Sequence, residues 1–95
     1  MKEYSIMNKT KKWSNKRESG LHRHEVFYGT ANRKKSIEDG LVVFLTPKLH
    51  NMSNEGVHFN KEFDTELKQT GQRIWMEYYN KSIEDFIKRY GRNYL

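Results

Sequence analysis

The sequence predicts a small α+β domain in which one β-hairpin packs on a helix and a further helix follows at the C-terminus. Three observations support this prediction. Two β-prone segments, 21–27 and 41–45, are separated by a basic turn. Segment 60–79 repeats its apolar residues with helical spacing. The 95 residues suffice for one domain built on a single core, which we divide into an arm (1–20), a hairpin motif (21–60) and helices (60–95).

The composition indicates a cytoplasmic, cation-rich protein. Eighteen Lys and Arg against 12 Asp and Glu give a formal charge of +6, and much of the excess lies in residues 1–17. Such a basic arm is typical of nucleic-acid binding, although a solvated arm that only aids solubility has the same composition. The lack of cysteine excludes disulfides and thiolate zinc sites. No apolar run approaches the roughly 18 residues of a membrane span, so we expect no membrane contact.

The first strand is predicted within 21–27, after an arm in which Trp13 either packs on the core, which we favour, or stacks on a base. Strand alternation places His22, His24 and Val26 on one face. Arg23 and Glu25 then lie on the other.

The connection from this strand to the next is predicted to hold one helical turn at most, within 33–39. Ser36 and Asp39 have the spacing of a capping box, and Gly40 is a stop signal. The apolar run 41–45, ended by Pro47, is the clearest strand and should pair with the first.

The long helix is predicted to begin after Asn60 as N-cap and to be weakened by Gly71. Its apolar stripe is Phe63, Leu67, Ile74 and Tyr78, with Trp75 beside it. By the same capping-box spacing, Ser82 and Asp85 predict the start of a second helix. This helix should end at Gly91, and the tail 92–95 should dock on the core. Its apolar face comprises Ile83, Phe86, Ile87 and Tyr90.

All four histidines, His22, His24, His50 and His58, lie in the motif 21–60. Each alone is typical of a surface or core residue, but a hairpin packed on a helix would bring them together. Imidazoles bind zinc, nickel or manganese, and added carboxylate or water ligands admit magnesium. A metal that hydrolyses a phosphodiester also needs a base and cations that hold the backbone. The candidates are His24 and His50 as ligands, and His22 or Glu25 as base. The candidate phosphate clamp is Arg33, Lys34 and Lys35.

Six segments in order carry a family resemblance: LHRHEVFYG (21–29), NRKKS (32–36), GL (40–41), LTPKLHN (45–51), GVHFN (56–60) and GRNYL (91–95). Together, residues 21–95 resemble a phage and prophage family of HNH nucleases of the recombination-enhancement type. The resemblance implies a ββα-metal fold and metal-dependent DNA cleavage. It implies His24, His50 and His58 as metal ligands and His22, His24 and Glu25 as the catalytic group.

Two departures from the family pattern stand out. Lys12, Asn15, Thr46 and Leu49 occupy positions where relatives carry the Cys and His ligands of a structural zinc, so we expect no zinc knuckle here. The loops must then be held by Trp13, Phe44, Leu49 and the helix stripe. Glu25 stands where the commonest pattern has a second His, which leaves the base open between Glu25 and His22.

The first hypothesis is therefore a phage endonuclease that uses one divalent ion (Mg, Mn, Ni or Zn) in the cytoplasm of a bacterial host. We expect structure-directed or nonspecific DNA contact. The second is a catalytically inactive protein on the same scaffold that binds nucleic acid or inhibits a host (defence) protein. Besides DNA, the candidate partners are therefore a host protein and a phage protein. A structural phage domain with incidental histidines is the third. The expected nucleic-acid-binding residues are Lys11, Lys12, Arg23, Arg33, Lys34 and Lys35.

Overall fold

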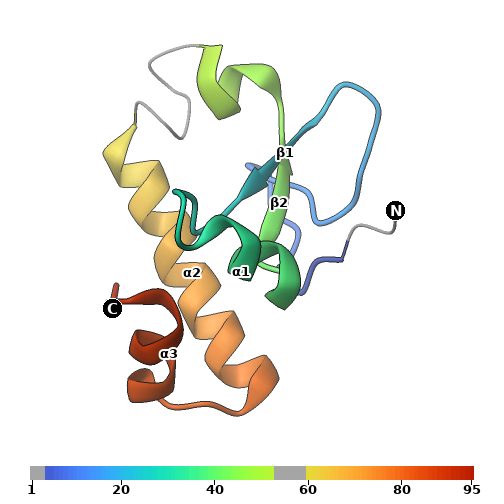
Figure 1. Ribbon diagram of the computed structural model, residues 1–95. Helices are drawn as coiled ribbons and strands as arrows, with labels where there is room; N and C mark the ends of the chain where they lie inside the picture. Colours follow the sequence, from blue (N-terminus) through green and yellow to red (C-terminus); the bar gives the residue numbers. More distant parts are fainter. Residues whose placement is uncertain (1–3, 53–59) are drawn as a thin grey trace.

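The two predicted β-segments pair as an antiparallel hairpin. In the computed structural model, which describes residues 4–52 and 60–95, β1 (His22–Glu25) pairs with β2 (Val42–Leu45), with His22 opposite Leu45 and Glu25 opposite Val42 (Figure 1). All four residues of β2 are buried, which suits a β-branched and aromatic run covered on both faces. The coarse α+β prediction is confirmed.

Helix α1 (Arg33–Asp39) is longer than the single turn predicted for this stretch. The predicted capping box is also wrong, because Ser36 lies inside the helix and Asn32 precedes it as N-cap. The Ser36 hydroxyl is buried and donates to the Phe27 carbonyl at 2.8 Å, while the Phe27 N–H donates to the same hydroxyl at 3.1 Å. These bonds tie α1 to the end of the first strand segment. Gly40, at φ 79°, ends the helix as predicted.

After Pro47 the chain forms a π-helical turn, η1 (Lys48–Met52), an element that the sequence did not predict. The His50 backbone N–H donates to the Thr46 carbonyl at 2.9 Å. The Leu49 N–H donates to the Thr46 hydroxyl at 3.3 Å. The turn therefore presents His50 directly beyond the end of β2.

Helix α2 (Lys61–Tyr79) starts at Asn60, whose side chain accepts from the Phe63 N–H at 3.1 Å, as predicted. Its buried face comprises Phe63, Leu67, Gly71, Gln72 and Trp75. The prediction that Tyr78 lies in this stripe is wrong, since Tyr78 is 58% exposed. Position 78 keeps the helical spacing of this face, but it lies in the last turn of α2, where the Tyr78 side chain is left exposed.

Gly71 brings α2 close to the end of the first strand segment. A Cβ at this position would lie 3.0 Å from Val26 Cγ1 and 3.3 Å from Phe27 Cε2. Both neighbours are fully buried, so neither has space to withdraw. Gly71 has a low helix propensity, but close packing against Val26 and Phe27 requires a residue without a side chain at this position.

Gly71→Leu is therefore expected to lower the free energy of unfolding by about 1–3 kcal/mol, despite the better helix propensity of leucine. Chemical denaturation followed by circular dichroism measures the change. Arg73→Leu, at an exposed position of the same helix, is the control and should change stability by less than about 0.5 kcal/mol. Equal effects of the two substitutions would contradict the packing role of Gly71.

Helix α3 (Ile83–Tyr90) begins with the predicted capping box between Ser82 and Asp85. Phe86 and Tyr90 are buried, but Ile83 and Ile87 are 38% and 39% exposed, so the predicted apolar face is only half right. The buried face of α3 is therefore narrower than the apolar face predicted from the sequence.

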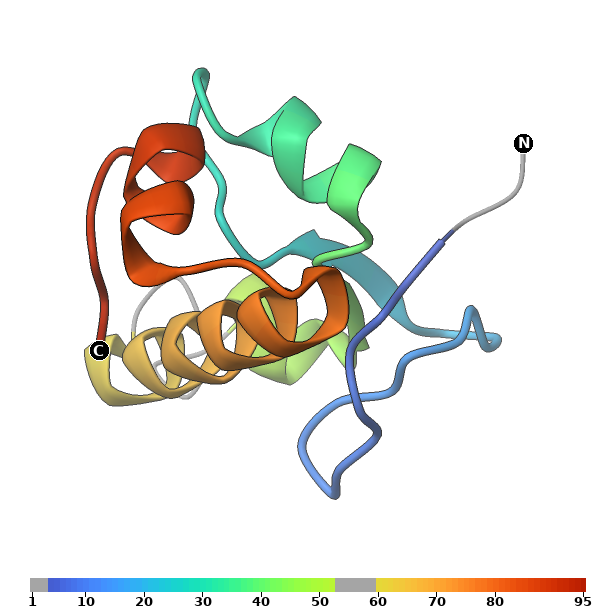
Figure 2. The same ribbon diagram turned by 90° about the horizontal axis from the view of Figure 1, so that it is seen from below.

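The C-terminal tail docks beside α2, as predicted (Figure 2). Gln69 Nε2 donates to the Tyr94 carbonyl at 2.9 Å, and the Tyr94 N–H donates to Gln72 Oε1 at 2.8 Å. The Tyr94 ring lies 5.2 Å from that of Phe27. Tyr94 of the tail thus packs against the hydrophobic core.

The arm packs on the core through Trp13, which is 4% exposed and stacks on Phe63 with ring centroids 6.2 Å apart. Its indole donates to the Asn8 carbonyl at 2.9 Å. Ser14 pairs with Phe44 as an additional bridge at the hairpin edge. The predicted packing role of Trp13 is confirmed. No helix in 4–52 or 60–95 has the length and apolar character of a membrane-crossing segment.

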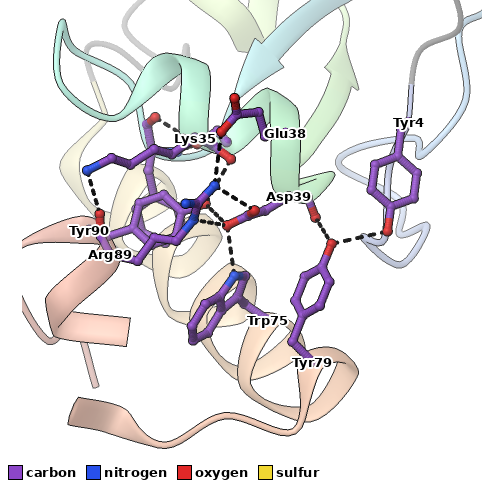
Figure 3. Close-up of polar contacts among 10 residues, drawn as sticks. Tyr4, Lys35, Glu38, Asp39, Trp75, Tyr79, Arg89 and Tyr90 are labelled. Carbon is purple, nitrogen blue, oxygen red and sulfur yellow. Dashed lines mark hydrogen bonds and ion pairs between the residues drawn. The ribbon is translucent and has the colours of Figure 1, made fainter. Parts of the chain in front are cut away.

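Asp39, at the end of α1, joins the helices (Figure 3). Its carboxylate accepts from Trp75 Nε1 of α2 at 2.8 Å, and from Arg89 Nε and the Tyr90 hydroxyl of α3 at 2.7 Å each. The Asp39 carbonyl accepts from the Tyr79 hydroxyl at 2.8 Å. Burial and the neighbouring Asp39 raise the pKa of Tyr90, so its hydroxyl stays protonated and donates.

Candidate functional site

Three of the four histidines meet at one end of the hairpin. His22 and His24 lie on β1, and η1 carries His50 to them. The Nδ1 atoms of His22 and His50 are 3.4 Å apart, and the rings of His24 and His50 have centroids 5.3 Å apart. His50 is thus the common neighbour of the other two. His58 lies outside the described residues.

The environments of the three rings differ. His24 is 2% exposed, whereas His22 is exposed and His50 is half-buried. The shared strand face predicted for His22 and His24 agrees with their contacts to the same ring of His50. Solvent and ligands therefore reach the cluster from the His22 and His50 side.

The distance between His22 Nδ1 and His50 Nδ1 suits two ligands of one ion. Two nitrogens about 2.05 Å from a tetrahedral ion lie about 3.3 Å apart, while hydrogen bonds usually span about 2.7–3.2 Å. The observed 3.4 Å fits a pair of ligands and also a long hydrogen bond between the two rings. Within 4–52 and 60–95, however, no group of three His, Asp or Glu side chains converges on a metal position. The described residues thus fit two ligand positions of an ion and no more.

A cleft of about 910 Å³ opens beside the histidines. Three arginines, two histidines and one carboxylate give it a polar, cationic wall. Its lining residues are Arg17, Arg23, His24, Glu25, Tyr28, Gly29, Thr30, Arg33 and His50.

Glu25 holds two of these arginines. Its Oε2 accepts from Arg23 Nε at 3.1 Å, and its Oε1 lies 3.0 Å from Arg33 Nε. The Glu25 side chain is 11% exposed, against 65% for Arg33. Both carboxylate oxygens are therefore engaged by guanidinium groups, an arrangement that sequence reasoning did not anticipate for a candidate base.

The predicted nucleic-acid-binding residues separate into three groups. Arg23 and Arg33 line the cleft. Lys11 and Lys12 lie on the arm, where Lys12 pairs with Glu66 of α2 at 2.8 Å. Lys35 donates to the Arg89 carbonyl at 2.8 Å and so helps to join α1 to α3, while Lys34 is exposed.

Arg17 and Tyr28 are cleft residues that the sequence reasoning missed. The Arg17 guanidinium lies over the Phe44 ring, 5.0 Å from its centroid, and donates to the Leu21 carbonyl at 3.2 Å. These contacts turn the end of the arm toward the hairpin. The basic composition of the arm indicated that some of its cations bind nucleic acid, but no local pattern distinguished Arg17 from the neighbouring lysines.

Tyr28 lies beside the ion pair that Lys68 and Asp64 form. Lys68 lies 4.4 Å from the Tyr28 ring centroid and pairs with Asp64 at 2.9 Å. Burial first, and Asp64 next, raise the pKa of Tyr28. The Tyr28 ring is 5.5 Å from that of His24. The only sequence signal was the i,i+4 spacing of Asp64 and Lys68.

No family model, curated protein or solved structure matches the chain. The HNH resemblance of residues 21–95 accordingly stays a prediction. The case for a function rests on the cleft residues and the histidines beside them.

Proposed function

We propose that the protein is a metal-dependent endonuclease that hydrolyses DNA phosphodiester bonds in the arginine-lined cleft. One observation carries the proposal: His50, whose Nδ1 lies 3.4 Å from that of His22, lines a cleft that three arginines also line. Nitrogen ligands and phosphate-binding cations side by side are what metal-assisted hydrolysis of a phosphodiester requires.

The arginines hold the substrate. A guanidinium binds phosphate oxygens through two parallel N–H groups, and its charge is independent of pH in the physiological range. Arg17, Arg23 and Arg33 come from the arm, β1 and α1, so one backbone segment contacts three elements at once. The contacts are to phosphate, which predicts little sequence preference.

The histidines supply the ion's nitrogen ligands. In this proposal His22 and His50 bind the ion, and buried His24 packs against His50 and fixes its ring. A divalent ion held there would lower the pKa of a bound water and would stabilise negative charge on phosphate oxygens. His22 then acts as ligand rather than as base, and Glu25 is not required to accept a proton.

Incubation of the purified protein with supercoiled plasmid and Mg²⁺, Mn²⁺, Ni²⁺ or Zn²⁺ tests the proposal. We expect nicked and then linear DNA with at least one ion, and none after chelation with EDTA. A folded protein that binds DNA but nicks it with none of the four ions would refute the nuclease.

The second candidate is a protein on the same scaffold that binds nucleic acid without cleaving it or inhibits a host protein. The observation in its favour is that the described residues offer a pair of metal ligands and no group of three. It predicts DNA binding with a steep dependence on salt and no cleavage. Tight binding to a host protein that resists salt would indicate the inhibitor.

A further inference from the structure

We propose that Glu25 is a positioning residue that joins Arg23 and Arg33 into one clamp for a backbone phosphate. This inference rests on the proposed function in one respect: the phosphate that the clamp binds belongs to DNA. It does not depend on cleavage. It replaces the role of base, which the sequence left open for this carboxylate.

The geometry of Glu25 points to this role. One carboxylate reaches two guanidinium groups, at 3.1 Å to Arg23 Nε and 3.0 Å to Arg33 Nε. Glu25 is itself held by β1 pairing, opposite Val42, and is only 11% exposed. A fixed anion between two arginines thus sets the position of both.

Arg33 has most to gain from such an anchor. Its side chain is 65% exposed at the start of α1 and would otherwise sample many rotamers. Glu25 pairs with it through Nε, 3.0 Å from Oε1, and Arg33 lines the cleft. A guanidinium that is already ordered loses less conformational freedom when it binds phosphate.

The charge balance also favours anion binding. Glu25, Arg23 and Arg33 together carry a formal charge of +1, and Arg17 is a further cation among the residues that line the cleft. A proton acceptor with both oxygens in ion pairs is poorly placed to receive a proton from water. An anchored pair of guanidinium groups is well placed to receive a phosphate.

Glu25→Asp is the direct test, because it keeps the charge and shortens the reach of the carboxylate. Binding to a short fluorescent DNA duplex is measured by anisotropy over a range of salt concentrations, without added metal. We expect about five- to tenfold weaker binding, and a salt slope lower by about 1, as for the loss of one phosphate contact. Arg33→Ala should lower the slope similarly, and Glu25→Asp should have a smaller effect when added to it.

Arg73→Ala, which removes the same charge from an exposed position on α2, is the control for Arg33→Ala and should leave the slope nearly unchanged. Thermal unfolding confirms that each variant is folded. Wild-type affinity and slope in folded Glu25→Asp would overturn the clamp.

Glu25→Gln separates the clamp from catalysis by Glu25. If the protein cleaves, we expect a raised KM, a kcat within about tenfold of wild type, and an unchanged pH profile. A loss of kcat of about 10²–10⁴-fold at saturating DNA, the usual effect of removing a general base, would assign that role to Glu25 and overturn the proposal.

Discussion

Asp39→Ala is expected to lower the free energy of unfolding by about 3–5 kcal/mol, which is a large part of the stability of a domain of this size. The substitution removes the acceptor for Trp75, Arg89 and Tyr90 at the same time. Denaturant unfolding monitored by tryptophan fluorescence measures the loss, and Trp75 itself reports on the site.

The physical reason lies in what the substitution leaves behind. The Asp39 carboxylate is 14% exposed, and its Oδ2 accepts from three donors (Figure 3). Without it, the buried indole and hydroxyl groups lose their partner, and each orphaned donor costs about 1–3 kcal/mol. Because the donors come from α2 and α3 and the acceptor from α1, the three helices lose their common contact.

Glu38→Ala is the matched control, since it removes the neighbouring carboxylate of the same helix. Glu38 is 50% exposed and pairs with Arg89 Nη2 at 3.1 Å. An exposed pair of this kind contributes about 1 kcal/mol or less. If Asp39→Ala destabilised the protein no more than Glu38→Ala does, the network would not be a principal source of stability.

The elements of this fold were predictable where short stretches of sequence decide them. The strand run 41–45, the N-cap Asn60 and the capping box at Ser82 are local signals, and the structure has an element at each. The failures occur where distant contacts decide. Ser36 has the spacing of a helix start, but its hydroxyl instead forms hydrogen bonds with the backbone of Phe27. These bonds form only because α1 packs next to the first strand segment.

The candidate site shows the same division. Strand alternation places His22 and His24 together, and the end of β2 brings His50 to them, so the histidine cluster follows from local rules. The partners of Glu25 do not follow from local rules, because Arg33 lies on α1, on the far side of a turn from β1. No repeating pattern in the sequence indicates that Arg33 and Glu25 form an ion pair. Arg17 enters the cleft only through its contacts with Phe44 and Leu21.

His50→Ala is expected to lower the rate of DNA nicking by on the order of 10²–10³-fold, while the fold and DNA binding persist. His50 is one of the two proposed ligands, with His22, and it also contacts His24, so its loss removes half of the ligand pair. Metal-ion catalysis supplies several kcal/mol, and each 1.36 kcal/mol corresponds to a factor of about ten. Plasmid nicking at a saturating ion concentration measures the effect.

His22→Ala distinguishes the two assignments of the cluster. If His22 is a ligand, its loss should weaken binding of Ni²⁺ or Zn²⁺ in calorimetry as much as His50→Ala does, because both nitrogens contact the ion. If His22 is instead the base, metal binding should persist while nicking falls. Lys88→Ala, at an exposed position of α3 outside the cleft lining, controls for the handling of the variants and should retain full activity. Nicking by His50→Ala at the wild-type rate would remove the histidine pair from the mechanism and with it the reason to propose a metal at this site.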